Sequence, residues 1–202
     1  MYTRRKYLVR RRDPILTGHD SEITCLWISA ELGIVVSGSE HSLILQYTLT
    51  EDILRAFENP YHMSTPRLLA PSNDGDIIVC YNRSNLCLYT LNGKLMRQAI
   101  FEDETIQNMV LNSDSQYTVI GGDRGFVQIL RIHDLQPVYA YPQCDASIRS
   151  LAITHDQNFL EILLFTYSIA SLSTGCLIVF DVNFNAINQS RRDPATIVAN
   201  SI

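Results

Sequence analysis

A pattern of four short strands that recurs about every 40 residues is the feature that most constrains how this sequence can fold. Runs rich in β-branched and aromatic residues alternate with turns rich in Gly, Asn, Asp and Ser. The polar turns between the first two strands align through Asp74, Asp114 and Asp156, in steps of 40 and 42 residues. Periods of about 40 to 45 residues with four strands per repeat are typical of β-propeller blades. The sequence therefore predicts an all-β fold.

We expect a partial propeller of about four blades, each with four antiparallel strands. The predicted strands are 23–29, 34–39, 43–49 and 53–57; 67–70, 77–81, 86–91 and 95–100; 106–111, 117–120, 126–132 and 137–141; and 148–153 with 176–182. The blades span about 15–58, 66–101, 105–141 and 147–184, between a basic N-terminal segment (1–14) and a polar C-terminal tail (185–202).

Several predicted strands are continuous apolar runs, such as Cys176-Leu177-Ile178-Val179-Phe180. A strand in a sheet with one solvent-exposed face shows alternating apolar and polar residues. A strand in a sheet that is buried on both faces shows a continuous apolar run. Helical periodicity over ten or more residues is absent. The pattern predicts that each sheet packs between two neighbours.

The fourth repeat carries eight extra residues, because Asp156 to Gly175 spans 19 residues where Asp114 to Gly125 spans 11. We place the insert near 161–168, in an apolar stretch that is poorly suited to an exposed loop. Eight more residues in one strand would exceed normal blade dimensions, so the insert is expected to bulge or change register. Either a displaced second strand with a longer turn at 171–174, or a mis-joined sequence, would account for it.

Two turns carry strong hairpin signals. Gly121-Gly122-Asp123-Arg124-Gly125 lies between two apolar runs and indicates a tight turn rather than a phosphate-binding loop, and Asn92-Gly93 predicts a type I′ turn. Asp123 and Arg124 at the first of these tips are candidates for contact with a partner, although exposed charges also occur on turns that only face solvent.

The net charge of the 202-residue chain is -5, which argues against nucleic acid as the main partner. Six basic residues in the first dozen form a local exception that could reach an anionic membrane surface, or simply remain solvated. The chain has no apolar run of about 18 residues and no signal-peptide core, so we expect it in the cytosol. Its five scattered cysteines contain no CxxC pair, which argues against zinc.

The chain resembles the C-terminal WD-repeat region of the neurobeachin and LPS-responsive beige-like anchor family, whose members carry a BEACH domain. The resemblance covers about 15–184 and departs from the family pattern at the eight-residue insert. It rests on 15–25, 30–39, Gly121-Gly122-Asp123-Arg124-Gly125 and 139–149, above all Ala140-Tyr141-Pro142-Gln143-Cys144-Asp145-Ala146.

Resemblance to WD repeats implies that His19 and Ser37 belong to a buried structural hydrogen-bond network in the first blade. The match is incomplete, since His41 stands where the turn aspartate would be and Tyr47 where the tryptophan would be. Trp27, the one tryptophan, could be an exposed anchor for a partner, but we favour packing between blades because a large aromatic contributes most when buried.

The family resemblance implies a non-catalytic protein-interaction scaffold that acts in vesicle trafficking and protein localisation, with other proteins or other domains of a BEACH scaffold as partners. No cofactor, small-molecule substrate or catalytic group is expected. A membrane-surface adaptor using the basic N-terminus is the alternative. The least favoured reading is a propeller enzyme, which would need His19, Asp145 and His155 to converge in one pocket. If the array continues beyond four blades in the family, its end faces are apolar and the isolated chain should be poorly soluble as a monomer.

Overall fold

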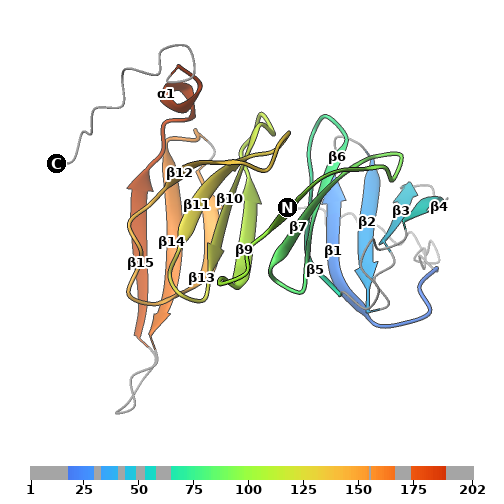
Figure 1. The fold of residues 1–202 in the computed structure, drawn as a ribbon, viewed down its shortest axis with the longest axis horizontal. Coiled ribbons are helices and arrows are strands. Elements are labelled where there is room, and N and C mark those ends of the chain that lie inside the picture. Colours follow the sequence, from blue (N-terminus) through green and yellow to red (C-terminus); the bar gives the residue numbers. More distant parts are fainter. Residues whose placement is uncertain are drawn as a thin grey trace, which may run out of the picture.

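The computed structural model of the chain describes residues 18–29, 33–40, 44–48, 53–57, 65–154, 156–166 and 174–189. Within these ranges the strands form four antiparallel sheets, which follow one another along the chain and stand side by side (Figure 1). We call these sheets blades 1 to 4. The all-β, partial-propeller prediction is confirmed.

The strands of each blade follow sequence order across the sheet. Blade 1 contains β1 (Ile23–Ser29), β2 (Ile34–Ser39), β3 (Ile44–Thr48) and β4 (Ile53–Phe57). Blade 2 contains β5 (Pro66–Pro71), β6 (Asp76–Tyr81), β7 (Asn85–Thr90) and β8 (Leu95–Ile100). Blade 3 contains β9 (Ile106–Leu111), β10 (Tyr117–Gly122), β11 (Val127–Arg131) and β12 (Pro137–Ala140). Blade 4 contains β13 (Ser147–Ile153), β14 (Phe159–Thr166) and β15 (Thr174–Asp181).

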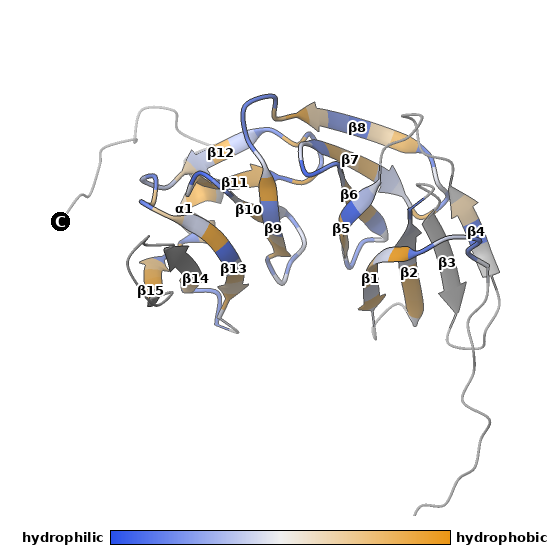
Figure 2. Cartoon of the chain, turned by 90° about the horizontal axis from the view of Figure 1, so that it is seen from below, coloured by the Kyte–Doolittle hydropathy of each residue, from blue (hydrophilic) through white to orange (hydrophobic). Residues whose placement is uncertain are grey.

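The four blades are arranged along an open arc, seen from below in Figure 2. The first strand of each blade lies on the inner side of the arc, and β5 lies against both β1 and β9, while β9 also lies against β13. The last strands, such as β4, β8 and β12, lie on the outer side. This arrangement is that of part of a propeller ring.

Three hydrophobic clusters fill the spaces between neighbouring blades. In β6, Ile77, Val79 and Tyr81 belong to the cluster between blades 1 and 2. The alternate residues Ile78 and Cys80 belong to the cluster between blades 2 and 3. All five are fully buried. The prediction that sheets are covered on both faces is confirmed for the inner blades, because successive side chains of a strand point to opposite faces. It fails for the strand that served as its example, since Leu177 and Val179 of β15 are exposed.

The turn after β7 differs from the predicted type I′ geometry. That geometry needs positive φ at both central residues, but of Asn92 and Gly93 only Gly93 has it, at 81°. Thr90 N donates to Lys94 O at 3.0 Å, and Gly93 N donates to Thr90 O at 2.8 Å. Three residues therefore close this hairpin, with glycine in the left-handed position.

Five of the eight extra residues of the fourth repeat lengthen the two arms of one hairpin. Of the predicted longer turn at 171–174, residues 171–173 lie outside the described part of the chain. β14 begins three residues after Asp156, as β10 begins three after Asp114, so the second strand is not displaced. Both β14 and β15 have eight residues, against six in β10 and five in β11. Their pairing runs without a break from Phe159↔Asp181 to Thr166↔Thr174. The predicted bulge or change of register was wrong, because residues added to both paired arms keep the register between them.

In the described part of the chain, blade 4 has three strands, and a short helix, α1 (Phe184–Gln189), follows them. Phe184 is buried and stacks on Tyr117 of blade 3, with ring centroids 5.7 Å apart. The prediction of a polar tail from 185 onward gave no sign of this helix, which is too short for a periodic signal.

Candidate interaction surfaces

The two residues assigned to a structural network in blade 1 are in direct contact. His19 Nε2 lies 2.6 Å from Ser37 Oγ, and Ser37 is buried in β2. Burial lowers the pKa of His19, partly offset by the neighbouring Asp20 carboxylate. The imidazole is therefore neutral near pH 7 and holds the chain entering β1 against β2. His41 and the Tyr47 side chain lie outside what the structure describes.

The glycine-rich turn joins β10 to β11, as predicted, but its glycines have different tasks. Only Gly125 takes a positive φ, of 80°. A Cβ on Gly125 would overlap the carbonyl oxygen of Cys144, and one on Gly122 would overlap the Phe126 ring. Gly121 sits close to Ile148 of blade 4. The turn needs glycine mainly because neighbouring segments approach it closely.

Asp123 and Arg124 stand at the tip of this turn with exposed side chains. Asp123 Oδ1 accepts a hydrogen bond from Ser147 Oγ at 3.1 Å. The Arg124 carbonyl oxygen accepts one from Gln143 Nε2 at 2.7 Å, and Cys144 N donates to Gly125 O at 2.9 Å. The tip is thus tied to the segment that connects blade 3 to blade 4, which presents the Arg124 side chain on a rigid support.

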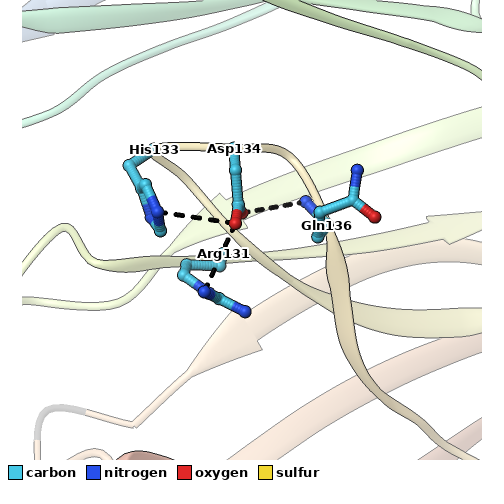
Figure 3. Close-up of polar contacts among 4 residues, drawn as sticks. All are labelled: Arg131, His133, Asp134 and Gln136. Atoms are coloured by element: carbon cyan, nitrogen blue, oxygen red, sulfur yellow. Dashed lines mark hydrogen bonds and ion pairs between the residues drawn. The ribbon is translucent and has the colours of Figure 1, made fainter.

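The turn between β11 and β12 is organised around the Asp134 carboxylate (Figure 3). Its Oδ2 lies 3.3 Å from Arg131 Nη1 and 3.4 Å from His133 Nε2, and its Oδ1 accepts from Gln136 N at 3.2 Å. Leu135 takes a positive φ of 56° and is buried. These contacts fold the turn onto the blade and have a structural role.

Trp27 is partly buried and packs against the cluster between blades 1 and 2. On the same strand, Thr24 Oγ1 donates to Pro66 O of blade 2 at 2.5 Å. The structure therefore places Trp27 where the packing interpretation expected it, at the first interface between blades.

One recurring polar position escaped the sequence prediction. Ser72, Asn112 and Thr154 precede the aligned turns, and each accepts a backbone N–H with its side-chain oxygen. The donors are Asp76 N at 2.9 Å, Tyr117 N at 2.9 Å and Phe159 N at 3.1 Å, respectively. The signal was the recurrence of Ser, Asn or Thr two residues before each aligned aspartate.

Three of the described cysteines are poorly suited to chemistry. Burial raises the pKa of Cys25 and of Cys87 to about 11, and that of Cys80 to about 12. These thiols stay protonated at neutral pH, and the thiolate is the reactive form. Among the described residues no group of three His, Cys, Asp or Glu side chains could hold a metal ion.

The hypothesis of a propeller enzyme needs His19, Asp145 and His155 to converge in one pocket. The two of these residues that the structure describes do not form one site. His19 contacts Ser37 in blade 1, whereas Asp145 is exposed in the connection between blades 3 and 4. His155 lies outside the described ranges. No helix in these ranges is long and apolar enough to cross a membrane.

The two ends of the arc expose hydrophobic side chains. Leu26 and Ile28 of β1 are 57% and 60% exposed on blade 1, and Leu177 and Val179 of β15 are 62% and 52% exposed on blade 4. Both end sheets carry hydrophobic stretches in Figure 2. Equivalent strands between the ends bury such residues, so these faces are candidate contact surfaces.

Comparison with known proteins identifies the array. The family description "Neurobeachin beta propeller domain" matches residues 2–190. The chain belongs to the neurobeachin β-propeller family. This neurobeachin-family propeller is 29% identical over 171 residues to a putative neurobeachin homolog of Caenorhabditis briggsae, covering 85% of the chain and 6% of that protein. It is 28% identical over 184 residues to BEACH domain-containing protein B of Arabidopsis thaliana, covering 91% of the chain and again 6% of the relative.

Solved structures show the same fold at lower identity. The neurobeachin-family propeller superposes on the computationally designed Ika4 protein with a TM-score of 0.65 at 19% identity, covering 84% of the chain and 96% of Ika4. It superposes on the C-terminal WD40 domain of Sif2 with a TM-score of 0.65 at 16% identity, covering 81% of the chain but 47% of that structure. The predicted family and WD-repeat fold are therefore confirmed.

Proposed function

We propose that this neurobeachin-family propeller is a non-catalytic scaffold that binds other proteins in vesicle trafficking and protein localisation. The observation that carries the proposal is the rigid mounting of Arg124. Its turn is tied by hydrogen bonds from Ser147, Gln143 and Cys144, while the Arg124 side chain itself is exposed. Arginine is enriched at protein contact sites, and a turn whose backbone is already ordered loses less conformational entropy on binding.

The surrounding chemistry supports binding rather than catalysis. The thiols of Cys25, Cys80 and Cys87 have raised pKa values, and His19 is hydrogen-bonded to Ser37. The family relatives are named for neurobeachin and for the BEACH domain, and the chain spans about 6% of the length of those compared. Other domains of such a protein are proposed partners alongside separate proteins.

Proximity labelling in cells tests the proposal. The wild-type chain should label a set of vesicle-associated proteins, and Arg124→Glu should lose part of that set. Arg97→Glu is the matched control, because Arg97 is exposed on the outer strand β8, away from the tip. Identical labelling by wild-type chain and Arg124→Glu would contradict a role for this tip.

A cytosolic location with peripheral membrane contact is a further part of the proposal. It is supported by the sequence of the basic segment, where Arg4, Arg5, Lys6, Arg10, Arg11 and Arg12 crowd the first dozen residues. Sedimentation with vesicles containing 30% phosphatidylserine, compared between the full chain and one lacking residues 1–12, tests the contact. Equal sedimentation of both would refute it.

A further inference from the structure

Each blade has two faces with distinct contacts. We call the face toward the following blade its leading face and the face toward the preceding blade its trailing face. On blade 3, the leading face presents Tyr117, Val119, Val127 and Ile129, all buried in the cluster between blades 3 and 4. The trailing face of blade 4 meets them with Leu160 and Ile162, among others. This pairing defines what an ordinary contact between blades looks like.

The leading face of blade 4 has the same layout but no described blade against it. Strand pairing fixes the correspondence, because Val119 pairs with Ile129 in blade 3, and Glu161 pairs with Val179 in blade 4. Phe159 therefore corresponds to Tyr117, Val179 to Ile129 and Leu177 to Val127. Phe159 is 40% exposed, and the exposed Leu177 and Val179 complete an apolar patch.

Glu161 occupies a position that is fully buried in the other blades. The corresponding residues are Val36 in blade 1, Ile78 in blade 2 and Val119 in blade 3, and all three are fully buried. The Glu161 side chain is exposed. Asp181, paired with Phe159 on the same face, is exposed too. Carboxylates thus stand at the centre and at one end of a face that also carries the exposed apolar residues Phe159, Leu177 and Val179.

An ordinary apolar blade is a poor cover for this face. Burying an ionised carboxylate without a partner is strongly unfavourable, whereas a paired and hydrogen-bonded one is tolerated. A second copy of this chain would bring the trailing face of its blade 1. In the described part of that face, β1 and β2 present Leu26, Ile28 and Val35, with no Lys or Arg. His19, beside Ser37, has a lowered pKa and is neutral near pH 7.

We propose that the leading face of blade 4 binds a protein segment in which a Lys or Arg side chain is surrounded by apolar residues. The basic group pairs with Glu161, and the apolar residues cover Phe159, Leu177 and Val179. The sign of the charge selects the partner, because a like charge or a neutral apolar residue opposite Glu161 would be penalised. The inference rests on the proposed scaffold function and names a second surface and the chemistry of its ligand.

Selection from a displayed library of random 12-residue peptides tests the proposal. The full chain is the target, and peptides retained on Glu161→Val are removed by counter-selection. The selected peptides should share a basic residue flanked by apolar ones. Their synthetic versions should bind Glu161→Gln about 10-fold or more weakly than wild type, as expected for a hydrogen bond to a charged group.

Matched variants locate the binding. Glu102→Gln removes an exposed carboxylate in the connection between β8 and β9, and should leave binding unchanged. Leu177→Ser should weaken binding, whereas Leu95→Ser on the outer strand β8 should not. Arg124→Glu should have no effect, so that failure here and failure at the Arg124 tip are distinguishable. Each variant is checked for wild-type circular dichroism.

Three outcomes would overturn the proposal. Selected peptides that are acidic or purely apolar would show that Glu161 does not choose the ligand. Equal affinity for wild type and Glu161→Gln would show the same. A wild-type dimer in sedimentation that dissociates on Leu177→Ser would show that a second copy occupies the face.

Discussion

The hydroxyl oxygens of Tyr81 and Tyr89 lie 3.3 Å apart inside the interface between blades 1 and 2. Both rings are almost completely buried. Burial raises the pKa of each hydroxyl above its ordinary value, so both are protonated at neutral pH. One hydroxyl donates and the other accepts, which satisfies polar atoms in an apolar surrounding.

The losses of stability from replacing Tyr81 and Tyr89 should not be additive. Replacing both tyrosines should cost less than the sum of the two single replacements. Tyr81→Phe leaves the Tyr89 hydroxyl without this partner, and we expect a loss of about 1 to 2 kcal/mol in the free energy of unfolding. In the double variant the second replacement should cost less than it does alone, giving a favourable coupling of about 0.5 to 1.5 kcal/mol. Urea denaturation of the four proteins measures the cycle. Additive losses would show that the hydroxyls do not interact.

Gly125→Ala should destabilise blade 3 more than Gly75→Ala does. Both glycines have positive φ, 80° and 89°, so either substitution incurs about 1 kcal/mol of backbone strain. A Cβ at Gly75 has room, its nearest neighbour being Leu91 Cβ at 3.8 Å, whereas one at Gly125 overlaps the Cys144 carbonyl oxygen. We expect an additional 1 to 2 kcal/mol, roughly, at Gly125. Thermal unfolding of both variants checks this, and equal losses would contradict the close approach.

Native thiol labelling should be slow at pH 8. A thiol with a pKa of about 11 has only ~0.1% thiolate at that pH. In a background carrying Cys144→Ser and Cys176→Ser, the remaining Cys25, Cys80 and Cys87 should react with a disulfide reagent only after denaturant is added. Stoichiometric reaction in native buffer would contradict the burial of these cysteines.

Stability should fall on acidification below about pH 6.5 through His19. Its pKa is lower in the folded chain than the ordinary 6.5, because burial disfavours the imidazolium. In the window between the two values the unfolded chain binds more protons, so stability rises with pH there and is fully present above 6.5. His19→Gln should reduce the drop in unfolding midpoint between pH 7.5 and 5.5. An unchanged drop would show that other groups cause it.

The exposed apolar residues of blade 1 should limit solubility. Leu26 and Ile28 lie on an uncovered trailing face in the described structure. We expect Leu26→Lys with Ile28→Lys to raise the concentration at which the chain stays monomeric in sedimentation, because charge opposes association of apolar patches. Leu95→Lys with Met96→Lys, on the outer strand β8, is the control and should help less. A wild-type chain that is already monodisperse at high concentration would contradict the premise.

The strands could be predicted from the sequence because their signals are local. Apolar runs and turn residues gave Ile23–Ser29, Ile34–Ser39 and Ile106–Leu111 with their observed bounds. The steric need for glycine at position 125 could not be predicted, because the Cys144 carbonyl oxygen approaches Gly125 only in the folded chain. Phe184 likewise meets Tyr117 through tertiary packing.

The candidate surfaces were harder to predict than the fold. Arg124 was recognisable from its turn, but its mounting depends on Gln143 and Ser147 in the next connection. Glu161 was assigned to an irregular insert, and only the pairing with Val179 shows which face it occupies. Register across strands decides this, and a shift of one residue would have reversed it.

The long hairpin of β14 and β15 belongs to the one blade whose leading face meets no other described blade. Between two neighbours, added length in a strand must fit two packed interfaces at once, so blades 2 and 3 tolerate little change. Among the described blades, blade 4 packs against one neighbour. Within the described array, a longer strand or a charge on its leading face therefore disturbs fewer packed contacts than it would in blade 2 or 3, and such changes should cost less stability there.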